Sequence, residues 1–231
     1  MFRSLATTVC LAIAAVVLAV ATAEAAPSSP INIYGNLGTV NSTSTSNTVG
    51  YLSLAQPNQF QAQGFSVGNQ VGSSAWDIQE IQVGLGSSGA PSPVVGIYSS
   101  SPAPASLLAT FTGTTSVSTK GLYTFTGSFT ALQNTSYWVV LSNANSASLE
   151  SYEWYTNDAF TTPTQQNASN VNYLATLERN GVAGSWTNAI PSLSIGIRAA
   201  VAVPEPPTYA LAMVAGVLGA GAAARRRSKK A

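Results

Sequence analysis

The feature that most constrains this chain is a series of short apolar or alternating runs that recur beyond Gly50, with turn residues between them. Runs of this length are typical of strands, and no stretch among them shows a convincing helical period. The sequence therefore predicts an all-β domain built as an antiparallel β-sandwich. The expected strands are 63–67, 76–85, 94–98, 107–112, 122–129, 137–141, 152–155, 171–177 and 193–199.

Three of these runs carry finer predictions. The aromatic side chains of 123–129 follow a two-residue period, so that strand should bury one face. The run 76–85 changes parity near Gln79 and Glu80, which indicates a β-bulge. The run 137–141 is apolar throughout and should be a central strand covered on both faces. A jelly-roll and an immunoglobulin-like sandwich both accommodate these features.

The stretch before the first of these strands is poor in apolar residues. Residues 27–50 include the polar run 41–48, and only 31–34 has the pattern of a short strand. We expect the rest of the stretch to be mobile. The exported part is accordingly divided into a polar lead-in, 26–48, and a sandwich domain, 49–202.

The first 25 residues have the pattern of a secretory signal. Arg3 precedes the apolar stretch 9–21, and the small residues of 23–26 follow at the spacing that a signal peptidase requires. We therefore expect a signal helix over 1–25 that signal peptidase removes. Cys10 is the only cysteine and lies inside this segment, so the exported chain should contain no disulfide and no thiolate metal site.

The C-terminal segment 203–231 combines a short motif, an apolar run and a basic end. The run 207–224 has no charge and would form a helix of about 27 Å, close to the hydrocarbon thickness of a bilayer. The basic residues after it would hold the C-terminus in the cytoplasm, which leaves the preceding domain outside. The motif consists of Pro204, Glu205 and Pro206, and the basic end begins with Arg225, Arg226 and Arg227.

This order of features resembles the PEP-CTERM sorting tail of exported bacterial proteins. The resemblance implies transient anchoring in the inner membrane of a Gram-negative bacterium, followed by removal of the tail by an exosortase that recognises the motif. The released protein is then expected at the cell surface or in the extracellular matrix. The sandwich would thus be flanked by an N-terminal signal helix and a C-terminal transmembrane sorting helix. Hydropathy and charge alone also fit a permanent membrane anchor.

The order of the β runs resembles the choice-of-anchor R type of β domain, which stands in front of interchangeable sorting tails. This resemblance covers roughly 49–200 and implies a fold, without carrying over an activity or functional residues. It rests on Ala62–Val67, Ile78–Leu85, Val94–Tyr98 followed by Pro102, Tyr123–Phe125 and Tyr137–Leu141.

The composition excludes several kinds of chemistry. The chain contains no histidine, which removes the commonest general base and the commonest metal ligand. In the exported part three basic side chains stand against six acidic ones, a net charge of about −3 that argues against nucleic-acid binding. Glu150 and Glu153 have opposite strand parity, so a catalytic carboxylate pair would need Asp158 or Asp77 brought close by the fold. Asp77, Glu80 and Asp158 are weak calcium candidates, because no Asp-rich loop with ligand spacing is present. We therefore expect no catalytic residue, metal or cofactor.

Aromatic side chains suggest a different kind of site. Trp154, Tyr155, Tyr152 and Trp186 could form a flat platform for a sugar ring, although aromatic residues of a sandwich usually fill its core. The sequence thus favours an exported, non-enzymatic protein of the cell surface or matrix, associated with exopolysaccharide. A carbohydrate-binding module is the alternative, and a glycan-active enzyme a distant third.

Because the exported part lacks histidine and cysteine, its stability should come from packing alone. We predict that neither a chelator nor a reductant changes its melting temperature, measured by differential scanning calorimetry. A fall of several degrees with chelator would contradict this, because a metal that binds only the folded state stabilises it by mass action.

Overall fold

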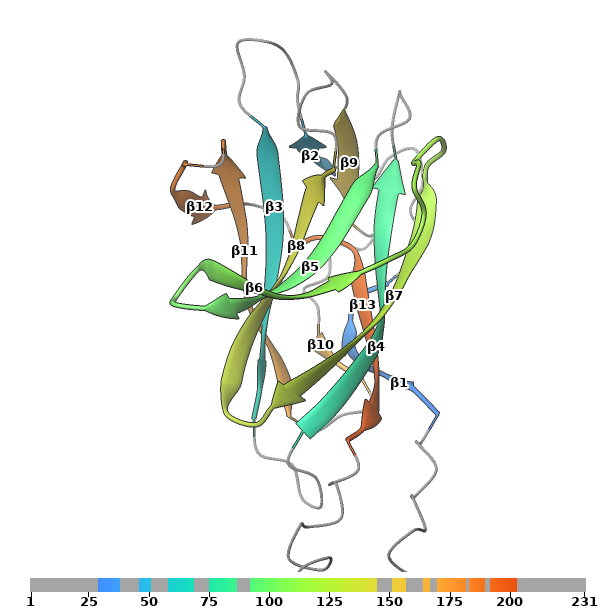
Figure 1. Ribbon diagram of the computed structural model, residues 1–231, viewed down its shortest axis with the longest axis vertical. Helices are drawn as coiled ribbons and strands as arrows, with labels where there is room; N and C mark the ends of the chain where they lie inside the picture. Colours follow the sequence, from blue (N-terminus) through green and yellow to red (C-terminus); the bar gives the residue numbers. More distant parts are fainter. Residues whose placement is uncertain are drawn as a thin grey trace, which may run out of the picture. The chain divides into compact units, whose positions relative to one another are not determined.

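The computed structural model describes residues 29–37, 46–50, 58–68, 75–86, 92–144, 151–156, 164–166, 170–181, 183–189 and 192–202. All of them belong to the unit Ser28–Ala202. In this part of the chain the regular structure is entirely β-strand, and 13 strands join one sheet in which every paired strand is antiparallel (Figure 1). The signal and sorting segments lie outside the described residues. None of the described residues forms a helix long and apolar enough to cross a membrane.

The predicted strands are all present, with shifts of one to a few residues at their ends. The strands are β1 (Ile31–Gly35), β2 (Ser46–Gly50), β3 (Gln59–Val67), β4 (Ala75–Gly86), β5 (Pro93–Ser100), β6 (Pro104–Phe111), β7 (Gly121–Leu132), β8 (Thr135–Asn143), β9 (Ser151–Tyr155), β10 (Thr164–Gln165), β11 (Val171–Asn180), β12 (Trp186–Asn188) and β13 (Ile195–Val201).

The sheet folds over so that two groups of strands face each other in a sandwich-like arrangement. One group runs β10-β1-β13-β4-β7, and the other runs β12-β11-β3-β8-β5-β6. The groups are joined on one side by the β2–β9 ladder, because β2 also pairs with β3 and β9 with β4. On the other side, Thr112 beyond β6 pairs with Thr126 of β7. The fold class predicted from the sequence is therefore confirmed as all-β and antiparallel.

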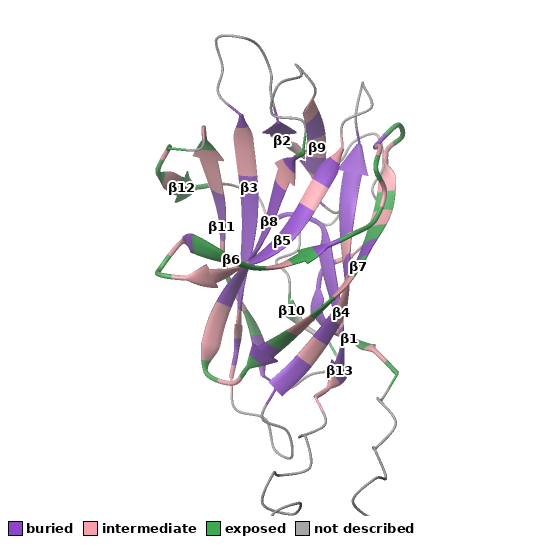
Figure 2. Cartoon of the chain, in the orientation of Figure 1, coloured by how far each residue is buried: buried purple, intermediate pink, exposed green. Residues whose placement is uncertain are grey.

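Side chains between the two groups form the main hydrophobic core. Figure 2 shows buried residues along strands of both groups. The ring of Tyr34 in β1 lies 5.8 Å from that of Phe65 in β3, and the Tyr34 hydroxyl donates a hydrogen bond to the carbonyl oxygen of Gly64 at 3.2 Å. These contacts join strands of opposite groups. Complete burial of a large apolar side chain contributes about 1.5–3 kcal/mol, so the two facing groups depend on each other for stability. The largest buried side chains include Trp76, Trp154, Tyr34, Tyr152, Phe65, Phe111 and Phe125.

The N-terminal stretch differs from the mobile lead-in expected from the sequence. β1 lies between β10 and β13, and its Ile33 and Tyr34 are completely buried. Ser46–Gly50 forms β2, which pairs with β9 along its whole length and buries Val49. The described parts of 27–50 thus belong to the sheet. Few apolar residues suffice here, because backbone hydrogen bonds to neighbouring strands supply the rest of the stabilisation.

The parity change predicted in β4 is a β-bulge at Gln79. Ile78 pairs with Ala199 of β13 and Glu80 with the adjacent Arg198, so Gln79 is the extra residue of β4 in this ladder. The ladder between β4 and β7 shifts at the same place, but there Ile78 pairs with Phe129 and Glu80 with Thr126, so the extra residue lies in β7. The extra residue allows apolar side chains on both sides of the bulge to point into one core. These side chains are Trp76, Ile78, Ile81, Val83 and Leu85.

The prediction of a doubly covered central strand is confirmed for β8, which lies between β3 and β5. Alternate side chains of 137–141 point into the main core. Trp138 and Val140 point to the opposite face, where they form a second cluster with Ala62 and Leu177. The outer face of this strand group therefore carries an apolar cluster of its own.

The bulge can be tested by deleting Gln79. Without this residue, the side chains on one side of position 79 would turn outward. We therefore expect the free energy of unfolding, measured in urea, to fall by several kcal/mol, on the order of the 3–5 kcal/mol lost when a large core side chain is removed. The matched control is Gln79→Ala, which keeps the extra residue and should change the stability by less than about 1 kcal/mol. Equal urea midpoints for the deletion and the control would show that the bulge is dispensable.

Candidate functional site

Two groups of sequence-predicted residues lie outside the described residues. They are the motif Pro204, Glu205 and Pro206 and the basic residues Arg225, Arg226 and Arg227. The structure therefore bears only on the aromatic and acidic candidates.

Tyr152 and Trp154 of β9 belong to the hydrophobic core and are completely buried. The indole Nε1 of Trp154 donates a hydrogen bond to the carbonyl oxygen of Ser194 at 2.8 Å, and the Tyr152 hydroxyl donates to that of Ser142 at 2.9 Å. Burial raises the pKa of Tyr152 well above its ordinary value. Neither ring has a free face, so neither residue can stack on a sugar.

Tyr155 points to the other face of β9, and its ring is already occupied. The ammonium nitrogen of Lys120 lies 3.7 Å from the ring centroid, a cation–π contact. One edge of the ring lies so close to Gly86 that a Cβ there would be 2.7 Å from a ring carbon. The Tyr155 hydroxyl donates a hydrogen bond to the carboxylate of Glu153. Burial, followed by this bond and the charge of Glu153, raises the pKa of Tyr155 to about 12.

Trp186 lies on β12 and packs against the outer apolar cluster instead of joining the other three aromatics. The expected sugar platform of Trp154, Tyr155, Tyr152 and Trp186 is therefore not formed as one exposed surface. The physical reason is the alternation of β9, which sends Tyr152 and Trp154 to the core and Tyr155 to the outside.

The acidic candidates are engaged in structural contacts where the structure describes them. Glu153 bonds to Tyr155, and Asp77 accepts hydrogen bonds from the Gln79 amide and the Ser128 hydroxyl, each at 3.1 Å. Within the described ranges, no three potential ligands among His, Cys, Asp and Glu come together. Glu150 and Asp158 lie outside those ranges.

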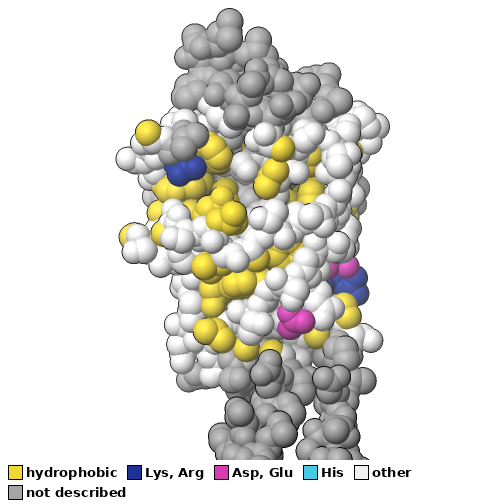
Figure 3. Space-filling view, in the orientation of Figure 1, with side chains coloured by type: hydrophobic (Ala, Val, Ile, Leu, Met, Phe, Trp, Pro, Cys, Tyr) yellow, Lys and Arg dark blue, Asp and Glu magenta, His cyan; other side chains and the backbone are white. Residues whose placement is uncertain are grey.

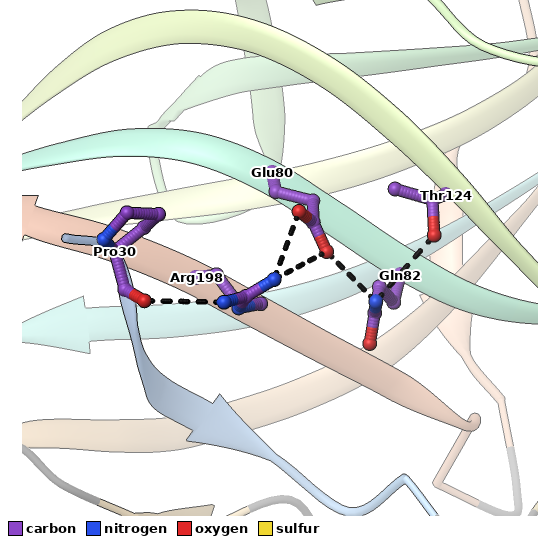
Figure 4. Close-up of polar contacts among 5 residues, drawn as sticks. All are labelled: Pro30, Glu80, Gln82, Thr124 and Arg198. Carbon is purple, nitrogen blue, oxygen red and sulfur yellow. Dashed lines mark hydrogen bonds and ion pairs between the residues drawn. The ribbon is translucent and has the colours of Figure 1, made fainter.

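Glu80 takes part in a polar network on the outside of the strand group that contains β4, β7 and β13 (Figure 4). Nη1 of Arg198 lies 3.1 Å from Oε2 of Glu80, and Nη2 donates to the carbonyl oxygen of Pro30 at 3.2 Å. The amide of Gln82 donates to Oε1 of Glu80 at 2.7 Å and to the Thr124 hydroxyl at 3.4 Å. This network connects β4, β7, β13 and the residue before β1, and it has a structural role.

A different candidate lies on the outer face of the group that contains β3 and β11. The guanidinium carbon of Arg179 is 4.4 Å from the ring centroid of Phe60 and 4.8 Å from that of Trp186. Phe60 and Trp186 are the register partners of Arg179 on its two sides, so the sheet itself places the cation between the two rings. We call Phe60, Tyr98, Arg179 and Trp186 the Arg179 cluster.

The floor beside this cluster depends on two glycines. The ring of Trp138 leans over Gly64, where a Cβ would lie 2.8 Å from a ring carbon. The side chain of Tyr98 lies over Gly96, where a Cβ would be 3.0 Å away. Without side chains at these positions the two aromatic rings can approach the backbone of the sheet closely. Figure 3 shows hydrophobic side chains gathered on this face together with basic atoms.

Electrostatics distinguish Arg179 from the other described arginine. Desolvation lowers the pKa of Arg179, and the charge interaction with Tyr98 opposes that shift. In the described residues the one ion pair joins Arg198 and Glu80. The buried Nε of Arg179 has no hydrogen-bond partner, and neither does the buried Nε1 of Trp186. Within the described part of the chain, the Arg179 guanidinium contacts two aromatic rings and no carboxylate.

Sequence reasoning missed the Arg179 cluster because its members come from four strands and three of them lie outside the predicted runs. Phe60 precedes the run 63–67, Arg179 follows the run 171–177, and Trp186 lies between that run and 193–199. One signal was available: Phe60, Ala62 and Gly64 share a strand face that is opposite to the core face of Phe65. Alternating apolar and glycine positions on that face predict a second packed surface.

No known family model matches the chain, and no curated protein matches it.

The Tyr155–Glu153 pair predicts a pH dependence at high pH. In the unfolded chain Tyr155 should ionise near its ordinary pKa of 10.0, and in the folded chain at about 12. The unfolded state therefore releases its proton first, so the stability from neutral Tyr155 is present below pH 10 and is lost as the pH rises to about 12. We expect Tyr155→Phe to lose less stability than the wild type over this window, measured by urea unfolding at successive pH values.

The matched control is Tyr123→Phe, which removes a hydroxyl that bonds to Thr119 instead of a carboxylate. Its free energy of unfolding should depend on pH as that of the wild type does. If the same held for Tyr155→Phe, the Tyr155–Glu153 pair would have no influence on stability.

Proposed function

We propose that this protein is an exported, non-enzymatic component of the cell surface or extracellular matrix of a Gram-negative bacterium. Its partners are signal peptidase, an exosortase-type membrane enzyme and exopolysaccharide, and its contact with the membrane is transient. The fold is proposed to be a β-sandwich of the jelly-roll or immunoglobulin-like kind.

One structural observation carries this proposal. β1 begins at Ile31 and β13 ends at Val201, so both proposed processing sites lie outside the strands. Cleavage near residue 25 and at Pro204–Pro206 would remove no strand from the sheet. Ile31 also pairs with Ala199, so the chain enters and leaves the sheet at neighbouring strand ends. A domain arranged in this way keeps its core when both flanking segments are cut off.

The proposed delivery route draws on the sequence of the flanking segments. The apolar run 207–224 and the basic residues after it supply insertion and orientation, and the Pro204–Pro206 motif supplies recognition. The sparse charge of the exported part and its many Ser, Thr, Asn and Gln residues suit a surface in contact with polysaccharide.

Carbohydrate binding is the second candidate function, and the outer face of the β11-β3-β8-β5 strands favours it. Aromatic rings packed closely over glycine positions resemble the surfaces on which sugar rings stack. Tyr98 and Trp186 are partly exposed there, whereas Trp138 is only 2% exposed and supports them from below.

The sorting proposal predicts the fate of a Glu205→Ala variant. The motif would be lost while the apolar run and basic end are intact, so the chain should insert normally and then collect uncut in the inner membrane. Mass spectrometry of membrane and released fractions would show a species that is larger by the uncut tail.

The control is Ser228→Ala, in the basic end, which should be processed and released like the wild type. A normal C-terminus on released Glu205→Ala protein would overturn the sorting proposal. So would intact Arg225–Ala231 on released wild-type protein, which would favour an ordinary anchor.

A further inference from the structure

The Arg179 cluster is arranged to receive an anion. The guanidinium is fixed between Phe60 and Trp186, so its position is set before any ligand arrives. Cation–π contacts hold the charge but satisfy none of its N–H donors. Among the described residues no carboxylate lies within ion-pair distance of Arg179.

The donors that a ligand could reach are the terminal nitrogens of the Arg179 guanidinium. Nε of Arg179 and Nε1 of Trp186 are buried without a hydrogen-bond partner, so protein atoms already cover them. Nη1 and Nη2 are not among the buried atoms without a partner, and the Arg179 side chain is partly exposed. A carboxylate is the group that best matches a guanidinium, because its two oxygens can accept two parallel hydrogen bonds.

The surroundings favour a sugar acid over a simple anion. Tyr98 of β5 packs against the same apolar cluster as Trp186, on the outer face of the sheet. The same face exposes Leu107 beside Tyr98 and has an apolar floor of Trp138, Val140 and Leu177. The C–H faces of a pyranose ring pack on surfaces of this kind, while a ring carboxylate would reach the arginine.

From these contacts we infer that the outer face binds an acidic polysaccharide, with the carboxylate of a uronic acid unit on Arg179 and adjoining rings against Tyr98 and the apolar floor. The identity of the polymer rests on the proposed function, which delivers the protein to a polysaccharide matrix. The requirement that the ligand be negatively charged rests on the Arg179 cluster alone.

The test measures binding of the full-length chain to polygalacturonate and to its fully methyl-esterified form. The two polymers share a backbone and differ in the charge of the carboxylate. We expect the wild type to bind polygalacturonate at least about tenfold more tightly, with an affinity that falls as salt is added. Equal affinities would overturn the inference in favour of a neutral-sugar site.

Variants locate the site. Arg179→Gln should lower the affinity for polygalacturonate about tenfold or more, and Arg179→Lys, which keeps a cation without the planar fork, should give an intermediate value. The matched control is Lys120→Gln, which removes one cation from the Tyr155 ring on another strand and should bind like the wild type. Melting curves of all three check that they are folded, and unchanged binding by Arg179→Gln would overturn the inference.

Two further outcomes are informative. Binding to poly-glutamate that equals binding to polygalacturonate would show that charge alone suffices, which contradicts the role of the sugar ring. A complete lack of binding to polygalacturonate by the wild type would also overturn the inference. It would leave the sorting proposal in place, because the Glu205→Ala experiment reports on processing and does not depend on any ligand.

Discussion

Closure of the sheet at the β2–β9 ladder is the constraint on which the rest of the structure depends. β3 and β4 each pair with three neighbouring strands, and the β2–β9 ladder connects them across the side of the molecule. β3 also lies between β11 and β8, and β4 between β13 and β7, so the ladder adds a partner at their ends, at Gln59 of β3 and at Leu85 and Gly86 of β4. Trp154 of β9 secures this ladder, since its buried indole also donates to the carbonyl oxygen of Ser194 just before β13. The residue that first suggested a sugar site is thus a structural residue of the closure.

The sequence predicts those features that depend on a single strand. Period and parity located the strands, and they placed the bulge of β4, because 76–85 cannot bury both of its apolar sets without an extra residue. They also separated the two faces of β7, where Phe125 is buried and its neighbours are exposed. In each case the information lies within about ten consecutive residues.

Features that depend on strand neighbours were harder to predict. Parity shows that Tyr152 and Trp154 share a face, but it does not say which face of β9 meets the core. Residues 29–37 and 46–50 contain few apolar side chains, yet strands on both sides of β1 and the ladder with β9 hold them in the sheet. The Arg179 cluster needs four separate pairings, β12 with β11, β11 with β3, β3 with β8, and β8 with β5, before its members meet.

The same pairings explain why a binding surface can exist on strands that also support the core. Inner and outer side chains alternate, so Phe65 and Val67 serve the main core while Phe60 and Ala62 face outward from the same strand. A ligand on the outer face then meets side chains whose backbone is fixed by the ladders, and little conformational entropy is lost on binding. Arg179 shows the consequence. Its guanidinium is partly desolvated and lies between two rings, so less of the free energy of a carboxylate contact is spent on ordering a flexible side chain.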